Sequence, residues 1–348
     1  MSYNTKYASK NSYRYRKNQG YYNHRAYFDD LNQFQQDREA NNNYNINRVT
    51  PPEGYLEVFS DQFSGNSLDT TKWDTGIPWG TFHTDPEQQG FYFPPNGTGP
   101  NSNTIRVNNG ILELDCTYDP KNYDVNNLSG RDAWRKESLL NWCDGGGHYQ
   151  EHPLFTIDYN GGSIFSKQSF RKGWFEIELK VPINQYLWTG IWLHGQQFWP
   201  PEIDIVEHFT EEMDHEISYQ PNIWVGGNNL NSPQFGTKVR GWYRPDLEYN
   251  FGCIKPDTMC LWAGPYRFTQ YVCHWTDDFI RIYYDGILYR EYDADIFHAL
   301  YRDNNIDMYI VLNNGVNNDY SHGNNFGDDH PYKTSTLYIN NVRVYQQQ

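Results

Sequence analysis

The sequence has no apolar run long enough to cross a membrane as a helix. Residues 1–20 are polar and rich in tyrosine, and they lack the apolar stretch that a secretory signal peptide requires. We therefore expect no membrane span, and no export signal is visible at this end of the sequence.

Cysteine is scarce, and its five residues follow no recognisable pattern: Cys116, Cys143, Cys253, Cys260 and Cys273. Their spacing contains neither CxxC nor the cysteine and histidine spacing of a metal site. The odd number leaves at least one thiol unpaired, which excludes a fold built on disulfides. Cys253 and Cys260 are close enough to bridge a loop, and reduced, buried cysteines are the alternative.

Positive charge is also in short supply. Lys and Arg total 28 against 43 Asp and Glu, which gives a net charge of −15. Such a chain is a poor partner for polyanions, so we expect no nucleic acid partner, and heavily sulfated polysaccharides are disfavoured. The charge is uneven, because residues 1–50 carry eight basic and four acidic residues and the remainder carries 20 and 39.

Residues 1–50 contain almost no aliphatic side chains and are rich in Asn, Tyr, Gln and Arg. A segment of this composition cannot bury enough apolar surface to offset the entropy lost on ordering. Two interpretations remain open, a flexible tail and an arm that binds an assembly or a surface. Pro51 and Pro52 mark a boundary, after which 51–348 is expected to form the folded domain.

Aromatic residues are abundant at 18%, including 30 Tyr and 12 Trp. Rings and β-branched residues favour strands. In 174–181, Phe175, Ile177 and Leu179 alternate with acidic residues, and Asp285-Gly286 separates two further strand patterns as a hairpin turn does. Many short strands without alternating helices predict an all-β sandwich.

Three acids lie close together in the run Glu202-Ile-Asp204-Ile-Val-Glu207. Alternate residues of a strand share a face, so Glu202 and Asp204 point the same way. Glu207 points to the other face of a regular strand, but one extra residue, a β-bulge at Ile205 or Val206, returns it to the shared face. The sequence therefore predicts a bulged strand with three acids on one side.

Paired carboxylates are the apparatus of glycoside hydrolysis. In a retaining enzyme one ionised carboxylate attacks the anomeric carbon, and a protonated one donates to the leaving oxygen. A third acid between them raises its neighbour's pKa through like-charge coupling. A solvent-facing acidic strand with no chemical role is the alternative interpretation of this run.

The run Glu202–Glu207 resembles the signature of the laminarinase, agarase and carrageenase group, glycoside hydrolase family 16. The resemblance extends over nearly all of 55–346. It includes strand-like segments before and after the acids: 59–63, 162–167, 173–182, 188–193, 199–201, 280–286 and 340–346.

The resemblance implies a concanavalin-like β jelly roll with the sugar lying across its concave sheet. It implies Glu202 as the nucleophile, Glu207 as the acid/base and Asp204 as the assisting acid. It also implies substrate contacts from Trp192 and Trp199, and Asn313 lies on a strand that crosses the cleft in relatives. Core packing of Trp192 and a buried structural amide at Asn313 are the alternatives.

No cofactor is required by this chemistry. Many relatives carry a structural calcium ion, but Asn340 stands where the closing strand often has Asp, which weakens that expectation here. An arginine that binds sugar hydroxyls in relatives is replaced by Ser163 or a neighbour. This departure concerns the choice of substrate rather than the acids.

The sequence thus predicts a retaining endo-β-glycanase acting on a 1,3- or 1,3/1,4-linked glucan or an agar-type galactan. A transglycosylase on the same site remains an alternative, because it differs only in whether sugar or water accepts the glycosyl group. A non-catalytic carbohydrate-binding module predicts loss of an acid, whereas all three are present. We expect action outside the cell, reached by another export route or on a virion that digests a polysaccharide coat.

Overall fold

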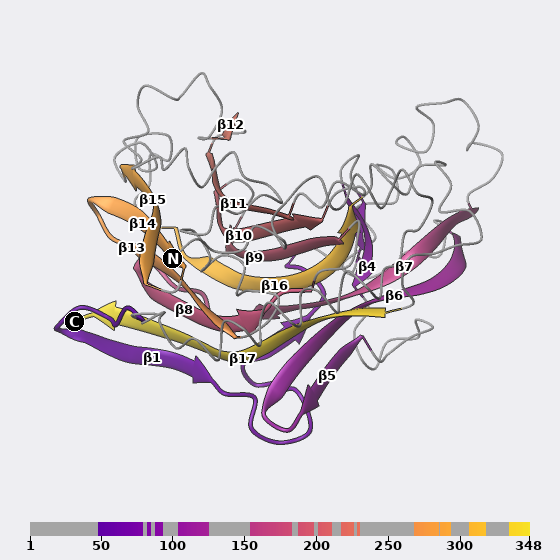
Figure 1. Ribbon diagram of the computed structural model, residues 1–348, viewed down its shortest axis with the longest axis horizontal. Coiled ribbons are helices and arrows are strands. Elements are labelled where there is room, and N and C mark those ends of the chain that lie inside the picture. Colours follow the sequence, from indigo (N-terminus) through magenta and orange to yellow (C-terminus); the bar gives the residue numbers. More distant parts are fainter. Residues whose placement is uncertain are drawn as a thin grey trace, which may run out of the picture.

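The computed structural model describes residues 48–78, 82–84, 88–92, 104–124, 154–182, 187–197, 201–210, 217–225, 228–229, 268–284, 286–293, 306–317 and 334–348. Regular structure within these residues is β-strand throughout, and the strands pack as two curved layers (Figure 1). This is the β jelly-roll sandwich that the sequence predicts. No helix in the described part of the chain is long and apolar enough to cross a membrane.

One layer, the acid-bearing sheet, holds Glu202, Asp204 and Glu207. In order of pairing it consists of β2 (Trp73–Thr75), β7 (Leu154–Ser166), β16 (Met308–Asn317), β9 (Leu187–Gly195), β10 (Glu202–Thr210), β11 (Ile217–Val225) and β12 (Asn228–Asn229). The strands β9, β10 and β16 lie above β17 and β1 in Figure 1, and β16 curves strongly.

The second layer is the outer sheet. In order of pairing it consists of β1 (Tyr55–Asp61), β17 (Thr334–Gln347), β8 (Gly173–Lys180), β13 (Thr269–Trp275), β14 (Phe279–Tyr284) and β15 (Ile287–Asp293). The remaining strands are β3 (Phe82–Thr84), β4 (Gln88–Tyr92), β5 (Ile105–Asn108) and β6 (Ile111–Asp124). β6 pairs with β17 near its start and with β7 further along, so it joins the two layers.

The predicted strands form where side chains alternate. Along β8, Phe175, Ile177 and Leu179 enter the core, and along β14 Ile280 and Ile282 do the same. Because successive side chains point to opposite faces of the sheet, such alternation places one face of the strand in the core and directs the other away from it. The predicted hairpin at 285–286 is confirmed, because β14 and β15 pair antiparallel across it.

The core between the sheets is built mostly from β-branched residues and rings, as the composition predicts. Trp73, Trp275, Tyr271, Tyr284 and Phe175 are among its largest fully buried side chains. Rings of this size bury a large apolar area each, so they can stabilise a sandwich whose aliphatic content is modest.

Two of the five cysteines fall within the described residues. Cys116 on β6 and Cys273 on β13 are buried, and burial raises the pKa of the Cys273 thiol. The other three cysteines lie outside the described residues.

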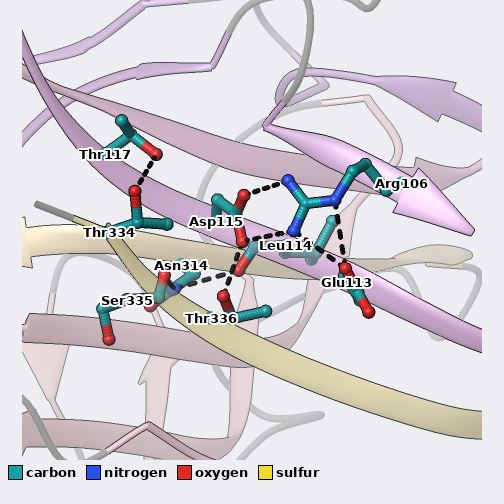
Figure 2. A network of polar contacts seen from close by, with 9 residues as sticks. All are labelled: Arg106, Glu113, Leu114, Asp115, Thr117, Asn314, Thr334, Ser335 and Thr336. Carbon is teal, nitrogen blue, oxygen red and sulfur yellow. Dashed lines mark hydrogen bonds and ion pairs between the residues drawn. The ribbon is translucent and has the colours of Figure 1, made fainter. Parts of the chain in front are cut away.

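Asn314 ties the acid-bearing sheet to the strands beneath it. Its Nδ2 donates to the carbonyl oxygens of Leu114 on β6 and Ser335 on β17, each at 3.0 Å. Its Oδ1 accepts a hydrogen bond of 3.0 Å from the hydroxyl of Thr189 on β9. Figure 2 shows the amide between these strands. A fully bonded amide inside an apolar core fixes how the two sheets lie on each other.

An ion-paired cluster borders this amide in Figure 2. Arg106 on β5 binds both Glu113 and the buried Asp115 on β6, and these carboxylates raise its pKa. Thr336 on β17 donates a hydrogen bond of 2.7 Å to Asp115. The cluster therefore links three strands at the edge of the outer sheet.

A short segment before β1 is clamped to the face of the outer sheet that points away from the core. Arg48 forms an ion pair with Glu178 on β8. The backbone of Val49 both donates to and accepts from the side-chain amide of Gln270 on β13, at 3.0 and 2.9 Å. We call Arg48 and Val49, with these two partners, the outer-face clamp.

Candidate active site

The three acids lie on β10 around a break in its pairing. Asp204 pairs with Asn222 on β11 and Glu207 pairs with Gln220, so β10 has one residue more than its partner over this stretch. The pairing with β9 shifts between Asp204 and Val206, which makes Ile205 the extra residue. The predicted β-bulge is confirmed.

The bulge places the apolar residues of β10 on one side and the acids on the other. Ile203, Ile205 and Val206 all belong to the buried core. Glu202 and Glu207 are partly exposed, and both lie close enough to Asp204 to influence its ionisation. The acids therefore share the face of the sheet that points away from the core.

Side chains of three neighbouring strands complete this face as rows that follow the strand pairing. The first row contains Glu202, His194 and Tyr309. The second row contains Asp204, Trp192, Val311 and Phe165. The third row contains Glu207, Gly190, Asn313 and Ser163. Directly paired residues have Cβ atoms about 5 Å apart. We call these three rows, on β10, β9, β16 and β7, the acid floor.

Asp204 is the most buried of the three acids, with 3% of its surface exposed. Burial raises the pKa of Asp204 well above its usual range, and the negative charges of Glu202 and Glu207 and a hydrogen bond to Glu202 raise it further. These effects favour the neutral form of this carboxyl, which in that form donates its proton to Glu202. The arrangement separates the ionisation of adjacent acids, as acid and base chemistry at one pH requires.

Trp192 pairs directly with Asp204. Its indole Nε1 donates a hydrogen bond of 2.7 Å to Oδ1 of Asn313. The ring is 8% exposed and packs in a small apolar cluster with Ile77, Phe165 and Val311. The structure thus brings Trp192 and Asn313 to the acid floor, where Trp192 is mostly packed.

Trp199, the other tryptophan predicted to contact substrate, lies outside the described residues. Sugar contacts by Trp192 and Asn313 remain predictions.

Sequence reasoning missed His194, Tyr309 and Gly190 on the same floor. His194 is 5% exposed and lies edge-on to Trp192, with ring centres 5.6 Å apart. The signal was present in the sequence, because Gly190 and His194 are two residues on either side of Trp192 and alternate residues share a face. Tyr309 could not be found without knowing that β16 pairs with β9.

Ser163, which the resemblance places at or beside the position of a sugar-binding arginine, has a structural role here. Its hydroxyl donates to the carbonyl of Gly76 at 2.8 Å, and the amide of Gly76 donates to the carbonyl of Ser163 at 2.9 Å. The side chain is fully buried. The residue therefore holds the chain after β2 against β7.

Positive charge is missing from the strands of the acid-bearing sheet near the acids. None of β7, β9, β10, β11 and β16 contains Lys or Arg. The described strands around the acids therefore supply no cation that would offset the negative charge of the ionised carboxylates on the floor. Neutral ligands suit such a surface better than anionic ones.

The surroundings of Asn340 do not fit a calcium ion. Asn340 and Asn341 each donate from Nδ2 to Oε2 of Glu178, at 2.7 Å, and Arg48 binds the other oxygen. Calcium requires several oxygen ligands directed at one point, whereas here the carboxylate is surrounded by N–H donors. Within the described residues no group of three His, Cys, Asp or Glu side chains could hold a metal ion.

Comparison with known proteins agrees with this geometry. Residues 114–327 match the model of glycosyl hydrolases family 16. A beta-glucanase from Rhodothermus marinus is 24% identical over 315 residues, covering 83% of this chain and 84% of the relative. The endo-1,3-1,4-beta-glycanase ExsH of Rhizobium meliloti (strain 1021) is 26% identical over 162 residues, which are 43% of this chain and 29% of that protein. The chain thus spans less than a third of ExsH.

Solved structures of similar fold include glucanases. The catalytic domain of an endo-1,3-beta-glucanase (laminarinase) from Thermotoga petrophila RKU-1 has a TM-score of 0.53 at 18% identity, covering 86% of this chain and all of that domain. SCLam, a non-specific endo-beta-1,3(4)-glucanase, has a TM-score of 0.54 at 18% identity, with 86% and 94% covered. At this identity the likeness is one of fold.

Proposed function

Because the chain belongs to glycosyl hydrolases family 16, we propose that it is an endo-acting, retaining β-glycanase that cleaves neutral glucans with β-1,3 or mixed β-1,3/1,4 linkages. The observation that carries the proposal is the buried Asp204, whose pKa is raised, between two partly exposed glutamates on one face of a sheet. A solvated acidic strand would not bury its middle acid.

In the first step Glu202 is the nucleophile. Its carboxylate attacks the anomeric carbon while Glu207 donates a proton to the glycosidic oxygen, so the C–O bond breaks and the leaving sugar departs as an alcohol. Asp204 keeps its proton and donates it as a hydrogen bond to Glu202, which orients the carboxylate. The product of this step is a covalent glycosyl-enzyme.

In the second step the roles of Glu207 reverse. Its carboxylate removes a proton from a water molecule, the water oxygen attacks the anomeric carbon, and Glu202 leaves as a carboxylate. Two inversions restore the β configuration. A sugar hydroxyl in place of water turns the same sequence into transglycosylation.

The choice of substrate follows from charge and from the relatives. The acid floor has aromatic and amide side chains beside the acids, and the strands that carry it lack Lys and Arg. A sulfated galactan would place negative charges above this floor at an electrostatic cost. The names of the relatives, beta-glucanase and endo-1,3-1,4-beta-glycanase, point to glucans as well.

A panel of purified polysaccharides tests the proposal. Laminarin and lichenan should be cut to a mixture of oligosaccharides, with agarose slower and carrageenans uncut. Proton NMR in the first minutes should show β-configured reducing ends before mutarotation. Initial α-configured ends would exclude the double displacement, and release of only single sugars would exclude an endo-acting enzyme.

A further inference from the structure

The bulge in β10 leaves a backbone group without a hydrogen-bond partner in the strand ladder. A bulged residue is unpaired in the ladder, so its peptide groups need other partners when buried. Ile205 is the extra residue relative to β9, and its side chain is fully buried in the core. Its carbonyl oxygen accepts a hydrogen bond of 2.7 Å from the hydroxyl of Tyr284.

Tyr284 comes from the opposite sheet. It is on β14, at the end of an alternating run in which Ile280, Ile282 and Tyr284 face the core. Its ring is 1% exposed and lies edge-on to Tyr271, with centres 5.0 Å apart. Ring packing therefore fixes where the hydroxyl lies, and the hydroxyl crosses the sandwich to the bulge.

The position of this bond matters because the bulge sets the face on which Glu207 lies. Without the extra residue, Glu207 would alternate to the core side, away from Glu202 and Asp204. The carbonyl of Ile205 is two residues before Glu207, within the stretch where the register shifts. Loosening this peptide would move Glu207 relative to the other two acids.

We propose that Tyr284 is a positioning residue for Glu207, acting through its hydrogen bond to the carbonyl of Ile205. Tyr284 is buried between the sheets and touches no substrate. It holds the bulged backbone in the one conformation that keeps the acid/base beside the nucleophile. The inference rests on the proposed function for the roles of the acids, and on geometry alone for the bond and the bulge.

Tyr284→Phe removes the hydroxyl and keeps the ring. Misplacement of a catalytic group by about 1 Å can cost up to about 100-fold in rate, so we expect kcat/KM on the polysaccharide to fall about 10- to 100-fold. KM should change little, because the substrate contacts are intact. Tyr292→Phe is the matched control, since Tyr292 is equally buried in the same core.

Leaving-group dependence separates positioning from general loosening. The leaving group of a dinitrophenyl glycoside is the dinitrophenolate ion, which departs without being protonated. The kcat/KM of this substrate therefore does not depend on a correctly placed acid. Tyr284→Phe should therefore keep most of its kcat/KM on this substrate while losing it on the polysaccharide. Tyr292→Phe should affect both substrates alike. Equal losses on both substrates in Tyr284→Phe, or no loss on either, would overturn the proposal.

Hydrogen exchange keeps the inference distinct from the proposed function. The amides of residues 205–207 should exchange faster in Tyr284→Phe than in the wild type, and Tyr292→Phe should leave them unchanged. If the wild type shows no glycosidase activity, the proposed function is wrong, but hydrogen exchange still tests whether the bond from Tyr284 holds the bulge. If the wild type is active and exchange at 205–207 is unaltered in Tyr284→Phe, the positioning role fails alone.

Discussion

The indole of Trp192 and the side-chain amide of Asn313 are joined by a hydrogen bond of 2.7 Å across two strands of the acid floor. Gly190 lies between Asn313 and Glu207 in one pairing row, and it is two residues before Trp192 on β9. A Cβ at position 190 would lie 2.7 Å from Oδ1 of Asn313 and 3.1 Å from two atoms of the indole ring. The missing side chain at Gly190 is therefore a condition for this bond beside the acids.

Gly190→Ala should disturb the acid floor more than the fold. The added methyl group must displace the amide of Asn313 or the ring of Trp192, and both are held by the bond between them. We expect kcat/KM on a β-glucan to fall about 10-fold, because small displacements near reacting groups have large effects on rate. Steady-state kinetics and a melting curve on the same preparation measure the two effects.

The Asn313→Ala background tests this explanation. Without the amide the methyl group loses its closest contact, so Gly190→Ala should cost less there than in the wild type. Additive losses in the double variant would show that the two positions act independently.

Substitution of the two glutamates should separate their roles. Glu202→Gln lacks the attacking carboxylate and should lose activity by about 10⁴-fold or more on every substrate. Glu207→Ala lacks the acid and should lose about 10²- to 10⁴-fold on polysaccharide. Kinetics on lichenan and on a dinitrophenyl glycoside distinguish them, because only Glu207→Ala should retain formation of the glycosyl-enzyme from the activated substrate.

Azide provides a chemical check on the same pair. It can attack the anomeric carbon of the glycosyl-enzyme without a general base, so it should accelerate turnover of Glu207→Ala and give a β-glycosyl azide. Glu202→Gln should not be accelerated in this way. An α-glycosyl azide from Glu207→Ala, or a β-glycosyl azide from Glu202→Gln, would exchange the assigned roles.

Asp204→Asn should make the protein more stable at neutral pH. Burial and the neighbouring acids raise the pKa of Asp204, so the folded state holds a proton that the unfolded state releases above its ordinary pKa. Stability from this group is therefore greatest at low pH and falls as pH rises above about 4. Asn is neutral at all pH values and avoids this loss.

Thermal melts of wild type and Asp204→Asn across pH 4 to 8 measure the difference. The variant should melt about 3 °C or more above the wild type near pH 7, a shift that about 1 kcal/mol produces in a domain of this size. The gap should narrow toward pH 4. A constant gap, or a variant less stable at pH 7, would contradict a protonated Asp204. Activity should fall because Glu202 loses its carboxyl donor.

The sequence predicted those parts of the molecule that depend on neighbours along the chain. The alternation of Phe175, Ile177 and Leu179 defined a strand and its buried face, and a bulge was required for Glu207 to join Asp204. Both predictions are confirmed. Local periodicity carries this information because strand geometry repeats every two residues.

Contacts between distant segments could not be predicted in the same way. Glu178 alternates with core residues and reads as a solvent-facing acid, yet it is 6% exposed because Asn340, Asn341 and Arg48 surround it. Tyr284 reads as an ordinary core ring, and its partner is 79 residues away. Such pairings depend on how the two sheets are stacked, which periodicity within one strand does not specify.

Chelation should leave the fold intact. Glu178 is already neutralised by Arg48 and bound by two amide groups, so no divalent cation is needed at Asn340. We expect the melting temperature to be the same with EDTA and with added calcium. A rise of several degrees with calcium would show that the protein binds the ion.

The outer-face clamp should protect the Arg48–Val49 peptide bond from trypsin. Trypsin must take the arginine side chain into its pocket and bind the backbone on both sides, but here Arg48 is held by Glu178 and Val49 by Gln270. Digestion of the native protein should therefore spare the bond after Arg48. Mass spectrometry of the resistant fragment identifies its first residue.

The variants Glu178→Gln and Gln270→Ala weaken the two halves of the clamp separately. Each should allow cleavage that leaves Val49 as the first residue, and the double variant should be cut fastest. Asp307→Asn is the matched control, because it removes a comparable surface ion pair, with Arg171, away from the clamp. Arg48 is about half exposed, so the clamp should contribute only about 1 kcal/mol to stability. The wild type should be cut at Arg48 more slowly than the double variant, because Arg48 and Val49 must leave their partners before trypsin can bind them. Equal rates of cleavage would show that the clamp does not persist in solution.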